Sequence, residues 1–305
     1  MFAIFRTQSS LDCWTQRWAL LGMFYAVGCV DPSANGNHDS AMEVVPSAEA
    51  CGQSVEVSEA ADLDAVAHCE TIQGDLIIEA STLRNVDALE GLSTVEGSLS
   101  IKGNPALHDL SGLAGLMHVG QEITISDNRV MTQISGFSSL LTVGESIAIL
   151  DNPALQDISG FTRLAFMRDD LAFQDNPALQ DISGFDRLAG IGGDLWMENN
   201  DSLLRVTGFG ALETVVGHLE VSDHAALMEM PVFPELASIG DGIAIVRNDA
   251  LRDIRGLTRL RTVVGWIEIN DNSRLTDISG FSDLSEVHGL VCIRKNPALN
   301  DISGF

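Results

Sequence analysis

Apolar and polar positions repeat every 24 residues along most of the chain. The decapeptide NPALQDISGF stands at 152–161, recurs unchanged at 176–185 and returns as NPALNDISGF at 296–305. One row of this period carries Asn at 104, 128, 152, 176, 200, 248, 272 and 296, and only His224 departs from it. Three residues later a row of Leu has the single exception Met131. Self-similarity at a fixed period predicts a solenoid in which each repeat forms one coil.

Within a coil, the pattern predicts one strand and several shorter segments. In residues 147–170, Ile147 and Ile149 alternate with a small residue, which is typical of a strand. The Asn-Pro pair that follows ends the strand, because Pro lacks the ladder donor. Apolar residues then recur every three positions, but Pro153 and Gly160 disfavour a long helix. We therefore expect short extended or 3₁₀ segments on the other sides of the coil.

Stacking aligns the strands of successive coils into a parallel sheet with about 4.8 Å between neighbours, and nine coils then make a rod roughly 40 Å long. The Asn row is expected to form an internal ladder by bonding turn amides of its own or the next coil. One position earlier lies a row of Asp at 127, 151, 175, 223 and 271, which could be solvated turn acids or a calcium-binding row. Gly103, Asn199, Arg247 and Lys295 interrupt this row, which favours solvated acids.

A short helix is predicted ahead of the first coils. Residues 58–68 (SEAADLDAVAH) combine helix formers with Ser58 as N-cap, and Leu63 and Val66 fall on one side. This segment is expected to cap the first coil.

The strand alternation also predicts an outward face. Leu99 and Ile101 point inward, so residues 98, 100 and 102 and their equivalents point outward. This face includes Trp196 and Trp266. An exposed indole beside carboxylates is a common recognition feature and also suits sugar rings. The alternative is that the two Trp side chains only cover neighbouring small residues. The candidate ligand-binding residues on this face are Asp170, Asp194, Trp196, Glu198, His218, Glu220, Trp266 and Glu268.

Charge excludes some partners. Lys and Arg number 17 against 43 Asp and Glu, so the net charge is −26. Nucleic-acid binding needs clustered cations and is not expected. The same charge repels anionic membranes, so membrane attachment requires an anchor.

The N-terminus resembles a bacterial lipoprotein signal. Arg6 and Arg17 precede the apolar stretch 18–27 (WALLGMFYAV), which has the length of a signal-peptide core. The following Gly28 and Cys29 resemble a lipobox, although Ala26 stands where that motif usually has Leu. This resemblance implies a signal peptide over 1–28, lipidation at Cys29 and outer-membrane or cell-surface localisation. An ordinary signal peptide, or a start at Met23 without a signal, is the alternative. Residues 29–50 then form a flexible tether.

Cysteine usage fits export. With Cys29 lipidated, Cys51 and Cys69 form an early pair, and a disulfide is the natural pairing in an oxidising compartment. No CxxC motif or Cys/His zinc spacing is present, so neither a metal nor a cofactor is expected.

Residues 51–305 resemble the receptor L domain, a leucine-rich-repeat-like solenoid of growth-factor receptor ectodomains and fungal cell-wall proteins. The resemblance rests on Cys51, on Cys69 followed by residues 71–78 (TIQGDLII), and on strings such as 188–195 (LAGIGGDL). It implies a right-handed, β-rich parallel solenoid, similar to a β-helix, with recognition or envelope roles and no catalytic residues. The array is longer and more uniform than a typical L domain, and its last coil is incomplete at Phe305.

We therefore expect a non-catalytic envelope lipoprotein that binds a protein or a glycan. One alternative is a polysaccharide-active β-helix enzyme, in which Glu198 and Glu220 on adjacent coils serve as paired carboxylates. Against it, periodicity generates such pairs automatically and no insertion builds a cleft. A purely structural envelope spacer is the other alternative.

Overall fold

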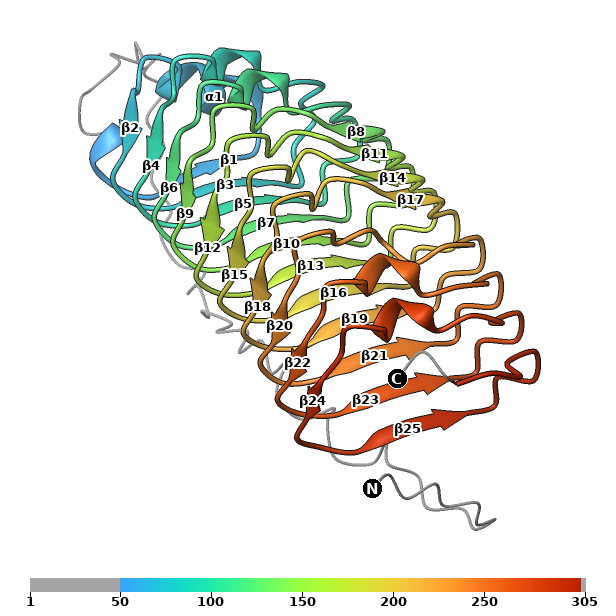
Figure 1. The fold of residues 1–305 in the computed structure, drawn as a ribbon. Helices are drawn as coiled ribbons and strands as arrows, with labels where there is room; N and C mark the ends of the chain where they lie inside the picture. The colour runs from blue at the N-terminus through green and yellow to red at the C-terminus, as the bar shows by residue number, and fades with distance from the viewer. Residues whose placement is uncertain (1–49, 303–305) are drawn as a thin grey trace, which may run out of the picture. The chain divides into compact units, whose positions relative to one another are not determined.

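The predicted solenoid is confirmed by a computed structural model, which describes residues 50–302. The predicted signal peptide, Cys29 and the tether up to residue 49 lie outside the described residues. Figure 1 shows successive coils stacked side by side, from α1 at one end to β25 at the other. Among the described residues, the strands form three parallel sheets that run along the stack.

The main sheet contains the strand predicted in each coil. Its 11 strands, counted over residues 50–302, pair in parallel and in sequence order. They are β1 (Val55–Val57), β3 (Leu76–Glu79), β5 (Leu99–Lys102), β7 (Ile123–Ser126), β10 (Ile147–Leu150), β13 (Leu171–Gln174), β16 (Leu195–Glu198), β19 (Leu219–Ser222), β21 (Ile243–Val246), β23 (Ile267–Asn270) and β25 (Val291–Arg294).

A second sheet follows the side of the solenoid that precedes each main strand. Its strands have two residues each and pair in parallel along the stack. They are β2 (Thr71–Ile72), β4 (Thr94–Val95), β6 (His118–Val119), β9 (Thr142–Val143), β12 (Phe166–Met167), β15 (Gly190–Ile191), β18 (Thr214–Val215), β20 (Ser238–Ile239), β22 (Thr262–Val263) and β24 (Glu286–Val287).

On the remaining side, some coils form a short strand and others form a 3₁₀ turn, the two kinds of segment that the sequence predicted. In the middle coils it forms a four-stranded sheet of β8 (Gln133–Ile134), β11 (Asp157–Ile158), β14 (Asp181–Ile182) and β17 (Arg205–Val206). In other coils it forms 3₁₀ turns, η2 (Asp87–Leu89), η3 (Ser111–Leu113), η4 (Arg255–Leu257) and η5 (Ser279–Phe281).

The first coils depart from the period. Leu76 pairs with Leu99, a step of 23 residues, whereas Leu99 pairs with Ile123 and each later step is 24. The helix α1 (Ala60–Val66) lies between β1 and β2, close to the predicted position, and buries Leu63 and Val66. Its N-cap is Glu59, one residue later than predicted, because Ser58 instead donates its backbone N–H and its hydroxyl to Asp62. The predicted disulfide between Cys51 and Cys69 is present and ties η1 (Ala50–Gly52) to the residues after α1.

Inside the coils, equivalent side chains form columns. Phe137, Phe161, Phe185 and Phe209 stack face to face, with ring centroids 4.9–5.3 Å apart. At the Ser-Gly bend, successive coils come into close contact: a Cβ atom on Gly136 would lie 1.9 Å from the Leu110 carbonyl oxygen. Such rows explain why the sequence keeps the same residue types at the same place in every coil.

The Asn row forms the predicted ladder. The side-chain oxygen of Asn152 accepts the backbone N–H of Asn128 at 3.0 Å, and its Nδ2 donates to the Ile125 carbonyl at 3.0 Å. The same pair of bonds recurs at Asn128 and at Asn176, all of them buried. Each of these Asn side chains thus accepts the turn N–H of the Asn in the preceding coil and donates to a main-strand carbonyl of that coil.

The Asp row before the ladder has a conformational cause. Asp127, Asp151 and Asp175 have φ between 54° and 57°, the left-handed region, and the later residues of the row share it. Asp and Asn adopt this region more readily than other non-glycine residues. The row is therefore explained by turn geometry, which agrees with the preference for solvated turn acids over a calcium row.

No helix among the described residues is both long enough and apolar enough to cross a lipid bilayer. In the coil of β24 and β25, several apolar side chains are only half-buried, and Leu290 is 81% exposed.

Candidate functional site

The candidate site lies on the outward face of the main sheet. In β16, Leu195 and Met197 are buried, whereas Trp196 and Glu198 point outward and are partly exposed, as predicted. The register places Trp196 beside Glu220 on β19, and Glu220 beside Ala244 on β21. Because the register is kept, outward residues at equivalent positions form straight rows across the sheet.

The central outward row changes character at β16. Across β5, β7, β10 and β13 it carries the small residues Ser100, Thr124, Ala148 and Ala172. From Trp196 onward it carries Trp196, Glu220, Ala244 and Glu268, and it continues to Cys292 on β25. Bulky and charged side chains therefore follow directly after four strands, β5 to β13, whose central outward residues are small.

His218 is the centre of this region. Its side chain is buried, and the centroids of the His218 and Trp196 rings are 4.1 Å apart in an edge-to-face arrangement. Nδ1 lies 2.9 Å from Asp194 Oδ1, and Nε2 lies 3.6 Å from Glu220 Oε2. Residues from two neighbouring outward rows, 194/218 and 196/220, on two successive coils thus form one cluster.

The cluster holds His218 as a cation. Burial alone would lower the pKa of His218, but hydrogen bonds to Asp194 and Glu220 outweigh it and raise this pKa to about 9. At neutral pH an imidazolium therefore lies between two carboxylates. Glu220 also accepts a hydrogen bond from Ser222 Oγ at 2.8 Å, which fixes its orientation further.

Two of the predicted ligand residues link coils. Asp170 Oδ1 accepts the backbone N–H of Asp194 at 2.7 Å, and Asp194 Oδ1 accepts the backbone N–H of His218 at 2.7 Å. Burial raises the pKa of Asp170. Each carboxylate therefore binds the backbone of the next coil directly before its main strand, so both have a structural role whether or not they contact a ligand.

Glu198 is a partly buried carboxyl group whose pKa is raised by its surroundings. Burial raises the pKa of Glu198, and the nearby Glu220 and Asp223 raise it further. Gln174 Nε2 donates to Glu198 Oε2 at 3.2 Å. Glu198 and Glu220 are thus diagonal neighbours on adjacent coils, and the charge of Glu220 acts on Glu198.

Trp266 and Glu268 lie further along the same face. The Trp266 ring covers Gly242, where a Cβ atom would lie 2.5 Å from the ring. Glu268 pairs with Arg294 at 3.6 Å and accepts a hydrogen bond from Asn270. Trp266 therefore covers a small neighbour and is also partly exposed, which combines the two roles that the sequence left open.

The face between the two Trp side chains is less open than the alternation implied. The outward residues of β21, Ala244 and Val246, are buried, as are Ser222 and Asn270 beside them. The predicted site thus divides into a larger cluster around Trp196 and a smaller one around Trp266, three strands away.

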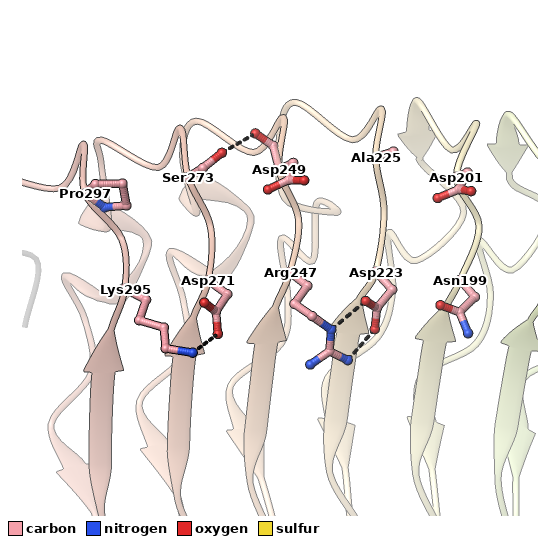
Figure 2. A pocket seen from close by; sticks show the side chains of 10 residues that line it. All are labelled: Asn199, Asp201, Asp223, Ala225, Arg247, Asp249, Asp271, Ser273, Lys295 and Pro297. Atoms are coloured by element: carbon pink, nitrogen blue, oxygen red, sulfur yellow. Dashed lines mark hydrogen bonds and ion pairs between the residues drawn. The ribbon is translucent and has the colours of Figure 1, made fainter. Parts of the chain in front are cut away.

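A shallow groove adjoins this face at the turns that end the strands. Figure 2 shows two rows of side chains lining it, one from the left-handed turn positions and one from two residues later. Its volume is about 690 Å³. The lining residues are Asn199, Asp201, Asp223, Ala225, Arg247, Asp249, Asp271, Ser273, Lys295 and Pro297.

Ion pairs between successive coils cross the groove floor. Arg247 binds Asp223 through two nitrogens, with Nε 2.6 Å from Oδ1, and Lys295 lies 3.3 Å from Asp271. Asp223 raises the pKa of Arg247, and Glu198 and Glu220 act on it in the same direction. Arg247 therefore couples the groove to the cluster around Trp196.

Sequence reasoning recorded Arg247 and Lys295 only as interruptions of the Asp row. The available signal was their order, since acid and base alternate at one position in four successive coils from Asp223 to Lys295. Coils stack about 4.8 Å apart, so alternating charges along a row lie within ion-pair reach.

Within residues 50–302, one group of possible metal ligands lies close together. Cys51, His68 and Cys69 offer donor atoms within 4.8 Å of one another, at the start of the solenoid. The two sulfurs are joined in the disulfide.

In comparisons with models of protein families, with curated proteins and with solved structures, no match to this chain was found.

Proposed function

We propose that the chain is a non-catalytic lipoprotein of the bacterial cell envelope, anchored through Cys29, whose solenoid binds an envelope protein or glycan. The observation that carries this proposal is the gathering of the partly exposed Trp196, Glu198 and Glu220 around the buried His218 on adjacent coils of one face. The signal-like N-terminus and the resemblance to receptor L domains support the location and the class of function.

The physical properties of the cluster suit recognition. The Trp196 indole packs at right angles against the charged His218 ring and is thereby held in one orientation, so little side-chain entropy is lost when a ligand packs on it. The surrounding carboxylates are acceptors for sugar hydroxyls or for the cationic groups of a protein. Because the sheet keeps one register over successive coils, the same face offers a long contact surface for an extended partner.

The test is binding by purified full chain to an array of envelope glycans and to surface proteins of the producing cell. Wild type is expected to bind one of these probes saturably, and Trp196→Ala to weaken that binding by at least tenfold, because aromatic anchors dominate such contacts. Trp266→Ala reports on the smaller cluster in the same assay. Phe166→Ala is the matched control, since Phe166 is 56% exposed but lies on β12 in the second sheet.

Two results would count against the proposal. Unchanged binding by Trp196→Ala and Trp266→Ala would remove this face from consideration. An absence of saturable binding to any probe would favour the structural spacer.

A second candidate is a polysaccharide-active enzyme. It is favoured by one observation, the raised pKa of Glu198 beside Glu220, which is the property a general acid needs. Turnover of an envelope polysaccharide by wild type that is lost in Glu198→Gln would establish it. Glu96→Gln, an exposed acid outside the main sheet, is the control.

A further inference from the structure

We propose that Cys51, His68 and Cys69 form a zinc site once the disulfide is reduced, so that a metal ion replaces the covalent link at the start of the solenoid. The inference is independent of the proposed recognition function. It rests on the positions of three donor atoms that lie close together in the structure, although the sequence shows no familiar Cys/His zinc motif.

The donor geometry fits a tetrahedral zinc site. Zinc binds Cys sulfur at about 2.3 Å and His nitrogen at about 2.0 Å, so S and N ligands on one tetrahedron lie about 3.5 Å apart. The distance from Cys51 Sγ to His68 Nε2 is 3.6 Å. His68 therefore already stands where a ligand next to Cys51 belongs.

Backbone hydrogen bonds fix Cys51 and Cys69 in addition to the disulfide, and His68 directly precedes Cys69 in the chain. The Cys51 carbonyl accepts the backbone N–H of Gln73 at 2.9 Å, and the Cys69 N–H donates to the Val66 carbonyl at 2.9 Å. Cys69 is buried, with a relative exposure of 3%, and His68 is exposed. After reduction, small side-chain rotations would separate the two sulfurs to the roughly 3.8 Å that a common zinc ion requires.

The chemistry balances with a dithiol reductant. The reductant transfers two electrons and two protons to the Cys51–Cys69 disulfide and is itself oxidised to a disulfide. Zinc then binds the two sulfurs as thiolates, which releases two protons, and takes neutral His68 through Nε2. Three protein ligands leave the fourth position to water, which is the arrangement of an open zinc site.

The experiment uses full chain in which Cys13, Cys29 and Cys292 are replaced by Ser, so that only the cluster retains thiols. Zinc ion alone is titrated calorimetrically into the oxidised and the phosphine-reduced protein. The reduced protein is expected to bind one zinc, and the oxidised protein to bind at least 100-fold more weakly. In the reduced protein, a further His68→Ala substitution is expected to weaken zinc binding at least tenfold. His288 is exposed in the last coil, and His288→Ala is the control that should leave zinc binding unchanged.

Cobalt serves as a second readout, because the absorption of its d electrons reports tetrahedral coordination by sulfur even if zinc affinity changes little. Circular dichroism of each reduced variant shows that it is folded. Equal zinc binding by the oxidised and reduced proteins, or binding and cobalt spectra indifferent to His68→Ala, would overturn the proposal.

Discussion

At the scale of single residues, the Asn ladder shows how a repeat places polar groups inside a coil. The ladder Asn residues from Asn104 to Asn272 are buried, and they both accept and donate hydrogen bonds to neighbouring coils. A buried backbone group left without a partner costs about 1–3 kcal/mol. The row is therefore under a chemical constraint as strict as that on the apolar rows.

Asn152→Ala is predicted to lower the free energy of unfolding by about 2–4 kcal/mol, because it leaves the buried Asn128 N–H without its acceptor and removes the bond from Asn152 to the Ile125 carbonyl. Urea denaturation followed by circular dichroism measures the change. Gln156→Ala, an exposed residue of the same coil, should cost less than about 0.5 kcal/mol. A loss for Asn152→Ala no larger than that of the control would show that the ladder adds nothing.

His224 occupies the one ladder position without Asn. Its Nδ1 accepts the Asn200 N–H at 3.3 Å, and its backbone N–H donates to Asn248 Oδ1. Burial lowers the pKa of His224 to about 4. The ring is therefore neutral in the folded protein at pH values where an unfolded His is already protonated.

The sign of the pH effect follows from this lowered pKa. The contribution of His224 to stability is fully present above pH 6.5, the ordinary pKa, and is lost as pH falls from 6.5 to about 4, because only the unfolded chain binds the proton. His224→Asn is predicted to remove up to about 3 kcal/mol of this acid sensitivity. Denaturation curves of both proteins at pH 7 and pH 4.5 test it, and an unchanged difference between them at the two pH values would contradict it.

At the scale of elements, the same local sequence forms different structures. Residues 157–161 and 277–281 both read DISGF, yet the first starts with β11 and the second contains the 3₁₀ turn η5. The middle coils pair with strand neighbours on both sides, whereas η5 packs against the 3₁₀ turn η4. Neighbouring coils decide between the two, which is why sequence predicted only short extended or 3₁₀ pieces here.

The Phe column ties these elements together. Phe185 stacks on Phe161 at 4.9 Å and on Phe209 at 5.3 Å, and it meets Phe173 edge to face. Phe185→Ala is predicted to cost about 3–5 kcal/mol by leaving a cavity at the centre of the stack. Thermal and urea unfolding measure the loss, with the exposed Phe166→Ala expected to cost less than about 1 kcal/mol. Similar losses for both variants would contradict a stacked core.

At the scale of the whole molecule, the period alone predicted the solenoid, the inward and outward rows and the Asn ladder. It did not predict which outward side chains pair with one another. The His218 contacts with Asp194, the position of Trp266 over Gly242 and the Arg247–Asp223 pair all depend on rotamers that a repeat leaves free. The approach of His68 to Cys51 was missed because it arises in the irregular first coils, where the period does not apply.

Coils are interchangeable units in such a fold, because each contacts only its neighbours. Deleting residues 129–152 joins Asn128 to Pro153 and removes one coil with the small outward residue Ala148. Deleting residues 201–224 joins Asn200 to Ala225 and removes the coil that carries His218 and Glu220. Both deletions keep the 24-residue register and shorten the solenoid equally.

The central claim, recognition by the outward face around Trp196, is tested most directly by the affinity of these two deletion proteins for the probe that wild type binds. Both are predicted to unfold cooperatively. The protein lacking residues 129–152 should keep wild-type affinity within about threefold, and the protein lacking residues 201–224 should lose saturable binding. Equal affinity of the two folded proteins would contradict the claim.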